Sequence, residues 1–352
     1  MKENSVGNID YTRNPLKSGI NGFDVLKFVM ALMIVAIHTK VYNDQVFRVF
    51  FWPAVRCAVP VFFILSSFFY FKKQRANNFD YRKMLHFVKR ICILYIFWMT
   101  VNIPFIIYFR ANDFTSCSIV GNVFCFLKLC LFYQLQGFPG SWFFSSLVWA
   151  VCIITIMKKL CIHDIFVFLL AAISYCFVWY INYLPSFFIV AKNLWSGFAT
   201  SRLNLTLFVA IPWCFIGYLL SSEKVSLWAE SILRNRARKY LVFTACIVLY
   251  MVFAVIGGSN QDYAWRNLLL APIVVFTFYF IKFPEWSYYK VLRNLSVLFY
   301  MLHFICIRFL HSISFGSVIL FYFETLATCL FLGLLILKLE ENKCFNWLKY
   351  CH

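Results

Sequence analysis

Ten apolar stretches, each long enough to cross the roughly 30 Å hydrocarbon core of a bilayer, occupy most of this chain. They cover residues 23–41, 52–71, 85–109, 141–157, 164–182, 205–221, 240–257, 265–281, 295–311 and 317–338. Inside hydrocarbon every backbone N–H and C=O group must find a partner within the protein, and in segments of this length an α-helix provides it. The sequence therefore predicts an all-α polytopic membrane protein with about ten transmembrane helices.

The amino-acid composition excludes a water-soluble fold. Hydrophobic residues make up 62% of the 352 residues, and charged residues make up only 13%, about half the share usual in soluble domains. The net charge of +19 would suit nucleic acid only on an accessible face, but the Lys and Arg lie mostly in short loops between apolar stretches. We therefore predict a lipid bilayer and no nucleic acid as a partner.

The cysteines are predicted to act as small apolar residues of the helices. The fourteen of them lie mainly inside apolar stretches, with no CxxC pair and no Cys/His cluster at metal-ligand spacing. The sequence therefore predicts neither a disulfide framework nor a metal site.

Basic residues are divided unequally between the two sides of the predicted membrane domain. The alternate loops on the side of the N-terminus, including residues 72–90, hold 23 of the 33 Lys and Arg. Loops rich in Lys and Arg stay in the cytoplasm, so both termini are predicted to be cytoplasmic. The expected location is the cell (inner) membrane, crossed many times.

This orientation divides the chain into three parts. Residues 1–22 form a cytoplasmic N-terminal segment, 23–338 one integral-membrane domain, and 339–352 a cytoplasmic C-terminal tail. The first apolar stretch is too long for a signal-peptide core and precedes no small-residue cleavage site, so we expect it to remain as the first helix. Residues 118–135 carry polar side chains among apolar ones and are predicted to form an interfacial or re-entrant helix.

The first apolar stretch contains three ionisable residues, Asp24, Lys27 and His38. At 100° per residue, the eleven-residue step from Lys27 to His38 returns to within about 20° of the same helix face, and Asp24 lies within about 60° of both. Ionisable groups inside a span are costly and often functional. On residue types alone an interfacial Lys27 and a structurally bonded His38 are equally acceptable.

At this polar stripe the sequence resembles the acyltransferase-3 family, which includes bacterial O-acetyltransferases of surface polysaccharides. That family has a basic residue followed eleven positions later by His in the first span, preceded by Asp. Lys27, His38 and Asp24 match this pattern, although the family's basic residue is commonly Arg. Lysine keeps the charge and loses the bidentate guanidinium geometry.

The resemblance continues along nearly the whole chain. VPVFFILSSFFYFKK, YRKMLHFVKRICILYIFW, the Ser-Trp-Phe at 141–143, RLNLTLFVAIPWCFIGYLL and LRNLSVLFYMLHF are similar to family patterns on successive spans. The chain departs from them at Ser67, where Gly is usual, and at Leu94, where Pro is expected. The order of these pieces, rather than any one of them, indicates the family.

The resemblance implies a membrane acyltransferase activity for residues 23–338. Such proteins move an acyl group from cytoplasmic acyl-CoA to an acceptor at or beyond the outer face of the membrane. We therefore expect acetyl-CoA, or another acyl-CoA, as the donor, no permanently bound cofactor, and a hydroxyl of a cell-envelope glycan as the acceptor. The alternative is a transporter or flippase for an envelope glycan or a lipid-linked intermediate, although the sequence lacks the internal repeat that many transporters carry.

The catalytic set predicted within this framework is His38, Asp24 and His303. His38 would remove the proton from the acceptor hydroxyl. Asp24 would pair with Lys27 or position it. His303, in the middle of the ninth span, is the second candidate for proton transfer, with a purely structural hydrogen bond as the alternative.

The predicted binding residues fall into two groups. Lys27, Lys89 and Arg90 are expected to hold the phosphates of the donor, since Lys27 lies about 16 Å from His38 at 1.5 Å per residue, a distance comparable to the reach of a pantetheine arm. A different set, on the outer side, is expected to bind the acceptor: Trp142, Arg202 and Arg308. Glu324 is the expected counter-ion of Arg308.

Overall fold

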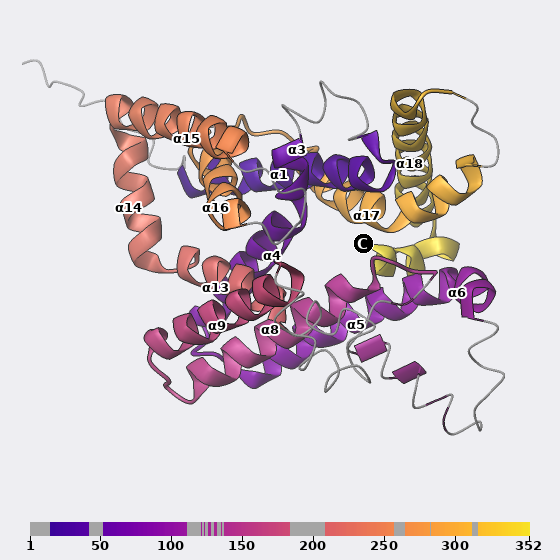
Figure 1. Ribbon diagram of the computed structural model, residues 1–352, viewed down its shortest axis with the longest axis horizontal. Helices are drawn as coiled ribbons and strands as arrows, with labels where there is room; N and C mark the ends of the chain where they lie inside the picture. Colours follow the sequence, from indigo (N-terminus) through magenta and orange to yellow (C-terminus); the bar gives the residue numbers. More distant parts are fainter. Residues whose placement is uncertain are drawn as a thin grey trace, which may run out of the picture.

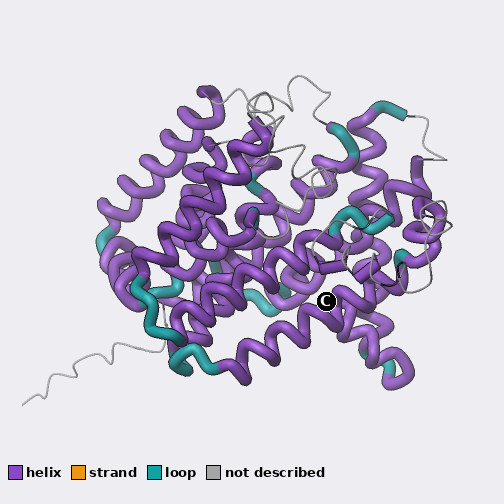
Figure 2. Tube along the Cα trace, turned by 60° about the horizontal axis from the view of Figure 1, so that its bottom comes forward, coloured by secondary structure: helices purple, strands orange, loops and turns teal. Residues whose placement is uncertain are grey.

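The computed structural model describes residues 15–41, 52–110, 137–183, 208–256, 265–281, 283–311 and 316–352, with scattered positions between 121 and 135. In these ranges the regular structure is helical, apart from one isolated bridge between Leu135 and Phe138. Figure 2 shows helices in every part of the trace that it describes. The all-α prediction is confirmed for this part of the chain.

Each of the ten predicted spans coincides with one described helix or with two consecutive ones. In chain order these are α1 (Pro15–His38), α3 (Trp52–Arg56) with α4 (Ala58–Arg75), α5 (Tyr81–Val101) with α6 (Ile103–Arg110), α8 (Ser141–Lys159), α9 (Asp164–Tyr183), α13 (Ala210–Leu220), α15 (Arg236–Ile256), α16 (Trp265–Phe280), α17 (Tyr289–His311) and α18 (Val318–Glu340). Most of the segment 118–135, predicted to be interfacial, lies outside the described residues.

Two predicted spans are interrupted, and proline accounts for both interruptions. Pro60 cannot donate a hydrogen bond to the carbonyl four residues earlier, and the helix ends at that residue, Arg56, and restarts after Cys57. Pro104 likewise stands in the first turn of α6, directly after the break at Asn102. The side chain of Asn102 donates to the carbonyl of Trp98 at 2.8 Å, which gives one of the last carbonyls of α5 a partner.

Helix α1 lies at the centre of the fold, against α3, α4, α16 and α17 (Figure 1). Its residues Phe23, Leu26, Ile34 and Val35 are 2% exposed or less, so this helix is buried along most of its length. Helix α4 packs on α13 so closely that a Cβ atom on Gly217 would collide with Ser67 and with the backbone of Ile64. The contacts of α1 with its neighbouring helices fix its polar stripe inside the helical body.

Many large apolar side chains face outward. Ile96 is 54% exposed, and Ile173 and Phe331 are each 66% exposed. Such a surface is stable against lipid and not against water.

Five described helices are long and apolar enough to cross a membrane: Asn21–His38, Tyr81–Val101, Ser141–Lys159, Tyr289–His311 and Val318–Glu340. The count of ten crossings and the orientation of the termini stay predictions.

Two further helices lie in segments that we predicted to be a loop and a tail. Helix α14 (Glu223–Arg234) begins with Ser222, whose side chain accepts a hydrogen bond from the backbone N–H of Val225. The 3₁₀ helix η2 (Lys343–Cys351) packs against α5, where Trp98 Nε1 donates to the carbonyl of Cys351 at 2.9 Å. The last residues are therefore folded onto the helical body.

Candidate functional site

Near the start of α1, the carboxylate of Asp24 forms an ion pair with Arg293 of α17. Asp24 is 1% exposed, and its two oxygens accept hydrogen bonds from Arg293 Nε at 2.8 Å and Nη2 at 2.6 Å. This two-pronged geometry is the strongest kind of ion pair between these side chains. The expected partner of Asp24 was Lys27, and the bonded partner in the structure is Arg293.

Lys27 lies one turn further along α1 and packs against an aromatic ring. Its Nζ atom is 4.6 Å from the ring centroid of Phe69, a cation–π contact. Asp24, Arg90 and Arg293 are all close enough to interact with it electrostatically. Helices α1, α5 and α17 thus bring three cations together around one buried carboxylate. Lys89 is exposed on α5, beside Arg90.

At the other end of the stripe, the ring of His38 lies beside His303 and Phe304 of α17. The ring centroids of His38 and His303 are 5.1 Å apart, and those of His38 and Phe304 are 4.5 Å apart. His38 is exposed, whereas His303 is completely buried. The structure therefore places two of the three predicted catalytic residues side by side, one exposed and one buried.

Two of the predicted acceptor-binding residues pack against aromatic rings in the structure. The ring of Trp142, at the start of α8, lies 6.1 Å from that of Phe63. The guanidinium of Arg308 stacks over Phe105 at 4.4 Å, and Glu324, its expected counter-ion, has an oxygen without a hydrogen-bond partner among the described residues. Arg202 lies outside the described residues.

Two arginines without a predicted role belong to these sites: Arg293, which the sequence places in a loop, and Arg56, which it places inside the second span. Arg293 binds Asp24, and Arg56, stacked on Trp52 at 4.5 Å, interacts electrostatically with His38. A signal for Arg293 was present: Arg293 precedes His303 by ten residues on α17, as Lys27 precedes His38 by eleven residues on α1. This repeated spacing places a cation and an imidazole at matching heights on two packed helices.

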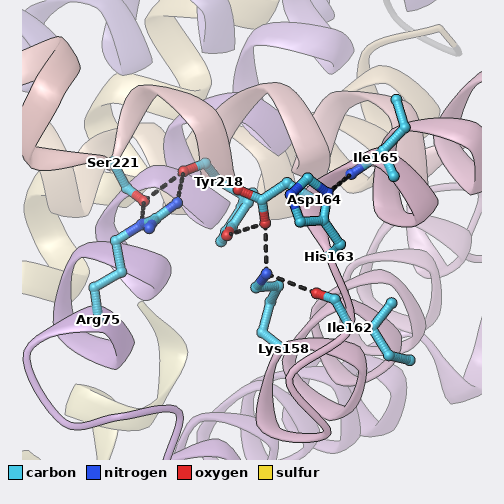
Figure 3. Close-up of polar contacts among 8 residues, drawn as sticks. All are labelled: Arg75, Lys158, Ile162, His163, Asp164, Ile165, Tyr218 and Ser221. Carbon is cyan, nitrogen blue, oxygen red and sulfur yellow. Dashed lines mark hydrogen bonds and ion pairs between the residues drawn. The ribbon is translucent and has the colours of Figure 1, made fainter.

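A separate polar network joins the ends of α4, α8, α9 and α13 (Figure 3). Lys158 forms an ion pair with Asp164 at 2.5 Å, and the hydroxyl of Tyr218 donates to the same carboxylate oxygen at 2.8 Å. Arg75 stacks over the Tyr218 ring at 4.1 Å and donates to Ser221 Oγ at 3.1 Å. Every charged group in the network has a partner, so the network serves to hold helix ends together.

The described residues contain no group of three or more His, Cys, Asp or Glu side chains that could hold a metal ion.

Known proteins match this chain over part or most of its length. A curated relative, an amino-acid racemase of Enterococcus faecalis, is 29% identical over 171 residues, which are 47% of this chain and 22% of the racemase. The chain therefore corresponds to about a fifth of that protein's length. No solved structure matches the chain.

The family comparison covers far more of the chain. The family model of an acyltransferase domain matches residues 20–338. This range contains all of the described helices from α3 to α17 and the whole stripe from Asp24 to His38. The motifs on the successive spans indicated the same family. The chain therefore belongs to the acyltransferase-3 family.

Proposed function

We propose that this protein is an O-acetyltransferase of the inner cell membrane that transfers an acetyl group from cytoplasmic acetyl-CoA to a hydroxyl of a cell-envelope glycan. The observation that carries the proposal is the layout of α1. A cation cluster lies around Lys27, and an exposed imidazole, His38, follows eleven residues later on nearly the same face. This arrangement suits a donor that is anionic at one end and reactive at the other.

The cation cluster supports the binding of CoA. Lys27 of α1 interacts electrostatically with Arg90 of α5 and Arg293 of α17 and with a single carboxylate, Asp24, so the cluster keeps an excess of positive charge for phosphate groups. A phosphate held there would leave a pantetheine arm pointing along α1, about 16 Å from His38 at 1.5 Å per residue. The thioester carbonyl would then lie within reach of the imidazole.

His38 is the proposed general base. It takes the proton from the acceptor hydroxyl as that oxygen attacks the thioester carbonyl. The tetrahedral intermediate then collapses, the C–S bond breaks, and the proton on His38 passes to the sulfur of the departing CoA. The imidazole returns to its neutral form, and each acetyl group transferred yields one CoA thiol.

The direct test uses the purified protein in lipid nanodiscs with acetyl-CoA labelled in the acetyl group and an envelope glycan fraction. We expect label in the glycan and an equal amount of free CoA thiol. Acetyl-CoA labelled in the pantetheine arm is the control, and it should leave the glycan unlabelled. A transporter or flippase would move glycan across a vesicle bilayer without transferring label, and that result would overturn the proposal.

The orientation is tested separately, because the donor and the acceptor are proposed to come from opposite sides. Ala76 is exposed in the loop that follows α4. An Ala76→Cys variant, in a background without the exposed native cysteines, should resist an impermeant thiol reagent in intact cells. It should react once the cells are permeabilised. Reaction in intact cells would place this loop outside and contradict the proposed use of cytoplasmic donor.

A further inference from the structure

His303 has one ring nitrogen bonded and one without a partner. Its Nδ1 atom lies 3.0 Å from the backbone carbonyl oxygen of Phe299, four residues earlier on α17. Its Nε2 atom is buried and has no hydrogen-bond partner among the described residues. The whole side chain is 0% exposed. A buried polar atom without a partner costs about 1–3 kcal/mol, so its presence calls for an explanation.

The bonded nitrogen fixes the tautomer of the ring. A carbonyl oxygen can only accept, so Nδ1 must carry the hydrogen and donate it to Phe299. In a neutral imidazole the other nitrogen then carries a lone pair and can only accept. His303 therefore holds a fixed acceptor, Nε2, in a position where water does not reach it.

Two ionisable rings lie beside His303 among the described residues: that of Tyr300, whose hydroxyl donates to the carbonyl of Gly140, and that of His38. The ring centroids of His38 and His303 are 5.1 Å apart and their planes are inclined by 36°. This spacing allows the facing nitrogens to come within hydrogen-bond distance, about 3 Å, by side-chain rotation alone. Phe304, whose ring centroid is 3.9 Å from that of His303, covers the pair with an apolar surface.

We propose that His303 is a positioning residue whose Nε2 atom accepts a hydrogen bond from the ring N–H of His38 during acyl transfer. The proposal rests on the proposed function, because it specifies how the base of that reaction is oriented. The hydrogen bond leaves the second nitrogen of His38 as a lone pair directed at the acceptor hydroxyl. When His38 takes the proton and becomes positively charged, the lone pair on Nε2 of His303 stabilises this charge through the hydrogen bond.

The protonation state of His303 does not change during the proposed reaction. The hydroxyl proton moves to the free nitrogen of His38 and later to the CoA sulfur, while the hydrogen between the two imidazoles stays on His38. His303 remains the neutral Nδ1–H tautomer throughout, because Phe299 continues to accept its hydrogen. A neutral histidine thus has the orienting role that a carboxylate has in hydrolytic triads.

The test compares two amides that resemble different nitrogens of the imidazole. His303→Gln is long enough to place an amide oxygen near the position of Nε2, where it can accept from His38. His303→Asn reaches only the position of Nδ1, so it can bond Phe299 and leaves His38 without an acceptor. We expect the Asn variant to lose about 10- to 100-fold in kcat with an unchanged KM for acetyl-CoA. The Gln variant should recover most of that loss.

Either of two results would overturn the proposal. An Asn variant with the wild-type kcat would show that the Nε2 acceptor is not used. Equal losses in the Gln and Asn variants would show that the ring itself, through packing or its own titration, is what matters. Donor KM and the elution profile of the purified protein in size-exclusion chromatography identify a variant that has merely unfolded.

A second measurement uses the wild-type protein, so it does not depend on the stability of a variant. The ¹⁵N chemical shifts of the histidine rings in uniformly ¹⁵N-histidine-labelled wild-type protein report which nitrogen carries hydrogen. We expect His303 to be protonated at Nδ1, and protonation at Nε2 would overturn the proposal. If the wild-type protein transfers no acetyl group, the proposed function fails while this measurement still reports the state of His303.

Discussion

The two ends of the polar stripe on α1, around Asp24 and around His38, differ in how their polar groups are paired. At the Asp24 end, a buried carboxylate is fully paired with Arg293, and Lys27 adds a second cation nearby. At the His38 end, an exposed imidazole lies among aromatic rings, next to a buried nitrogen of His303 that has no hydrogen-bond partner in the described part of the chain. The difference is that the buried carboxylate is bonded where α1 meets α17 at one end, whereas at the other end a buried ring nitrogen has no hydrogen-bond partner among the described residues.

The largest expected effect is at the histidine end. His38→Ala should lower kcat about 10²- to 10⁴-fold, the usual contribution of a positioned general base, while the protein stays folded. Acetyl transfer from labelled acetyl-CoA is the measurement. His86→Ala, which removes an exposed histidine of α5, is the matched control and should keep wild-type turnover. Near-normal turnover of the His38 variant would rule out its role as the base.

The next effect concerns the stability of the ionic end. Arg293→Gln should cost about 3 kcal/mol, because it leaves a carboxylate that is 1% exposed without its bonded partner. Asp24→Asn should cost less, since the Arg293 side chain is 50% exposed and can still be solvated. Thermal unfolding in a fixed detergent measures both variants. The double variant should cost less than the sum of the two, and additivity would contradict a direct pair.

A smaller effect is expected from Lys27, and on KM rather than kcat. Lys27→Ala should raise the KM for acetyl-CoA about tenfold, Lys27→Glu should raise it further, and Lys27→Arg should keep most of the affinity, because an ammonium binds phosphate as a point charge. Dephospho-acetyl-CoA provides the control donor. If Lys27→Ala leaves KM unchanged for both donors, Lys27 does not bind the donor and is an interfacial lysine.

The smallest effect is expected in the network of Figure 3. Asp164→Asn removes the ion pair to Lys158, but the side chain of Asp164 is half exposed and Tyr218 can still donate to the amide oxygen. The stability should therefore change by about 1 kcal/mol or less, with no change in turnover. A loss as large as that of Arg293→Gln would mean that exposure does not distinguish the two ionic regions.

The sequence predicted the positions of the helices well and their interruptions poorly. Apolar length alone located each of the ten stretches that the described helices occupy. The breaks at Cys57 and Asn102 depend on where a proline lies within a long apolar run, and hydropathy does not detect this. Helix α14 was missed because its segment is short and charged, although the Ser222 cap and the spacing of Val225, Ala229 and Ile232 were readable signals.

The site was predicted in part, and the remainder required three dimensions. The positions of Lys27 and His38 on one face follow from helix periodicity, so one sequence was enough to find them. The pairing of Asp24 with Arg293, and the contact of His38 with His303, join residues far apart in the chain. The sequence shows that residue 293 is a cation. Its partner depends on how α17 packs against α1, and the residues around Arg293 do not specify that packing.

The pairing of Asp24 with Arg293 has a consequence for biosynthesis. The two residues are 269 positions apart, so at about 5–20 residues per second the ribosome reaches Arg293 roughly 13–54 s after Asp24. During that interval α1 has left the ribosome with an acidic side chain and without the helix that will bind it. Lys27, three residues away on the same face, is then the cation that can pair with Asp24. We expect Lys27 to pair with Asp24 during insertion, and Arg293 to take over the hydrogen bonds to this carboxylate when α17 arrives.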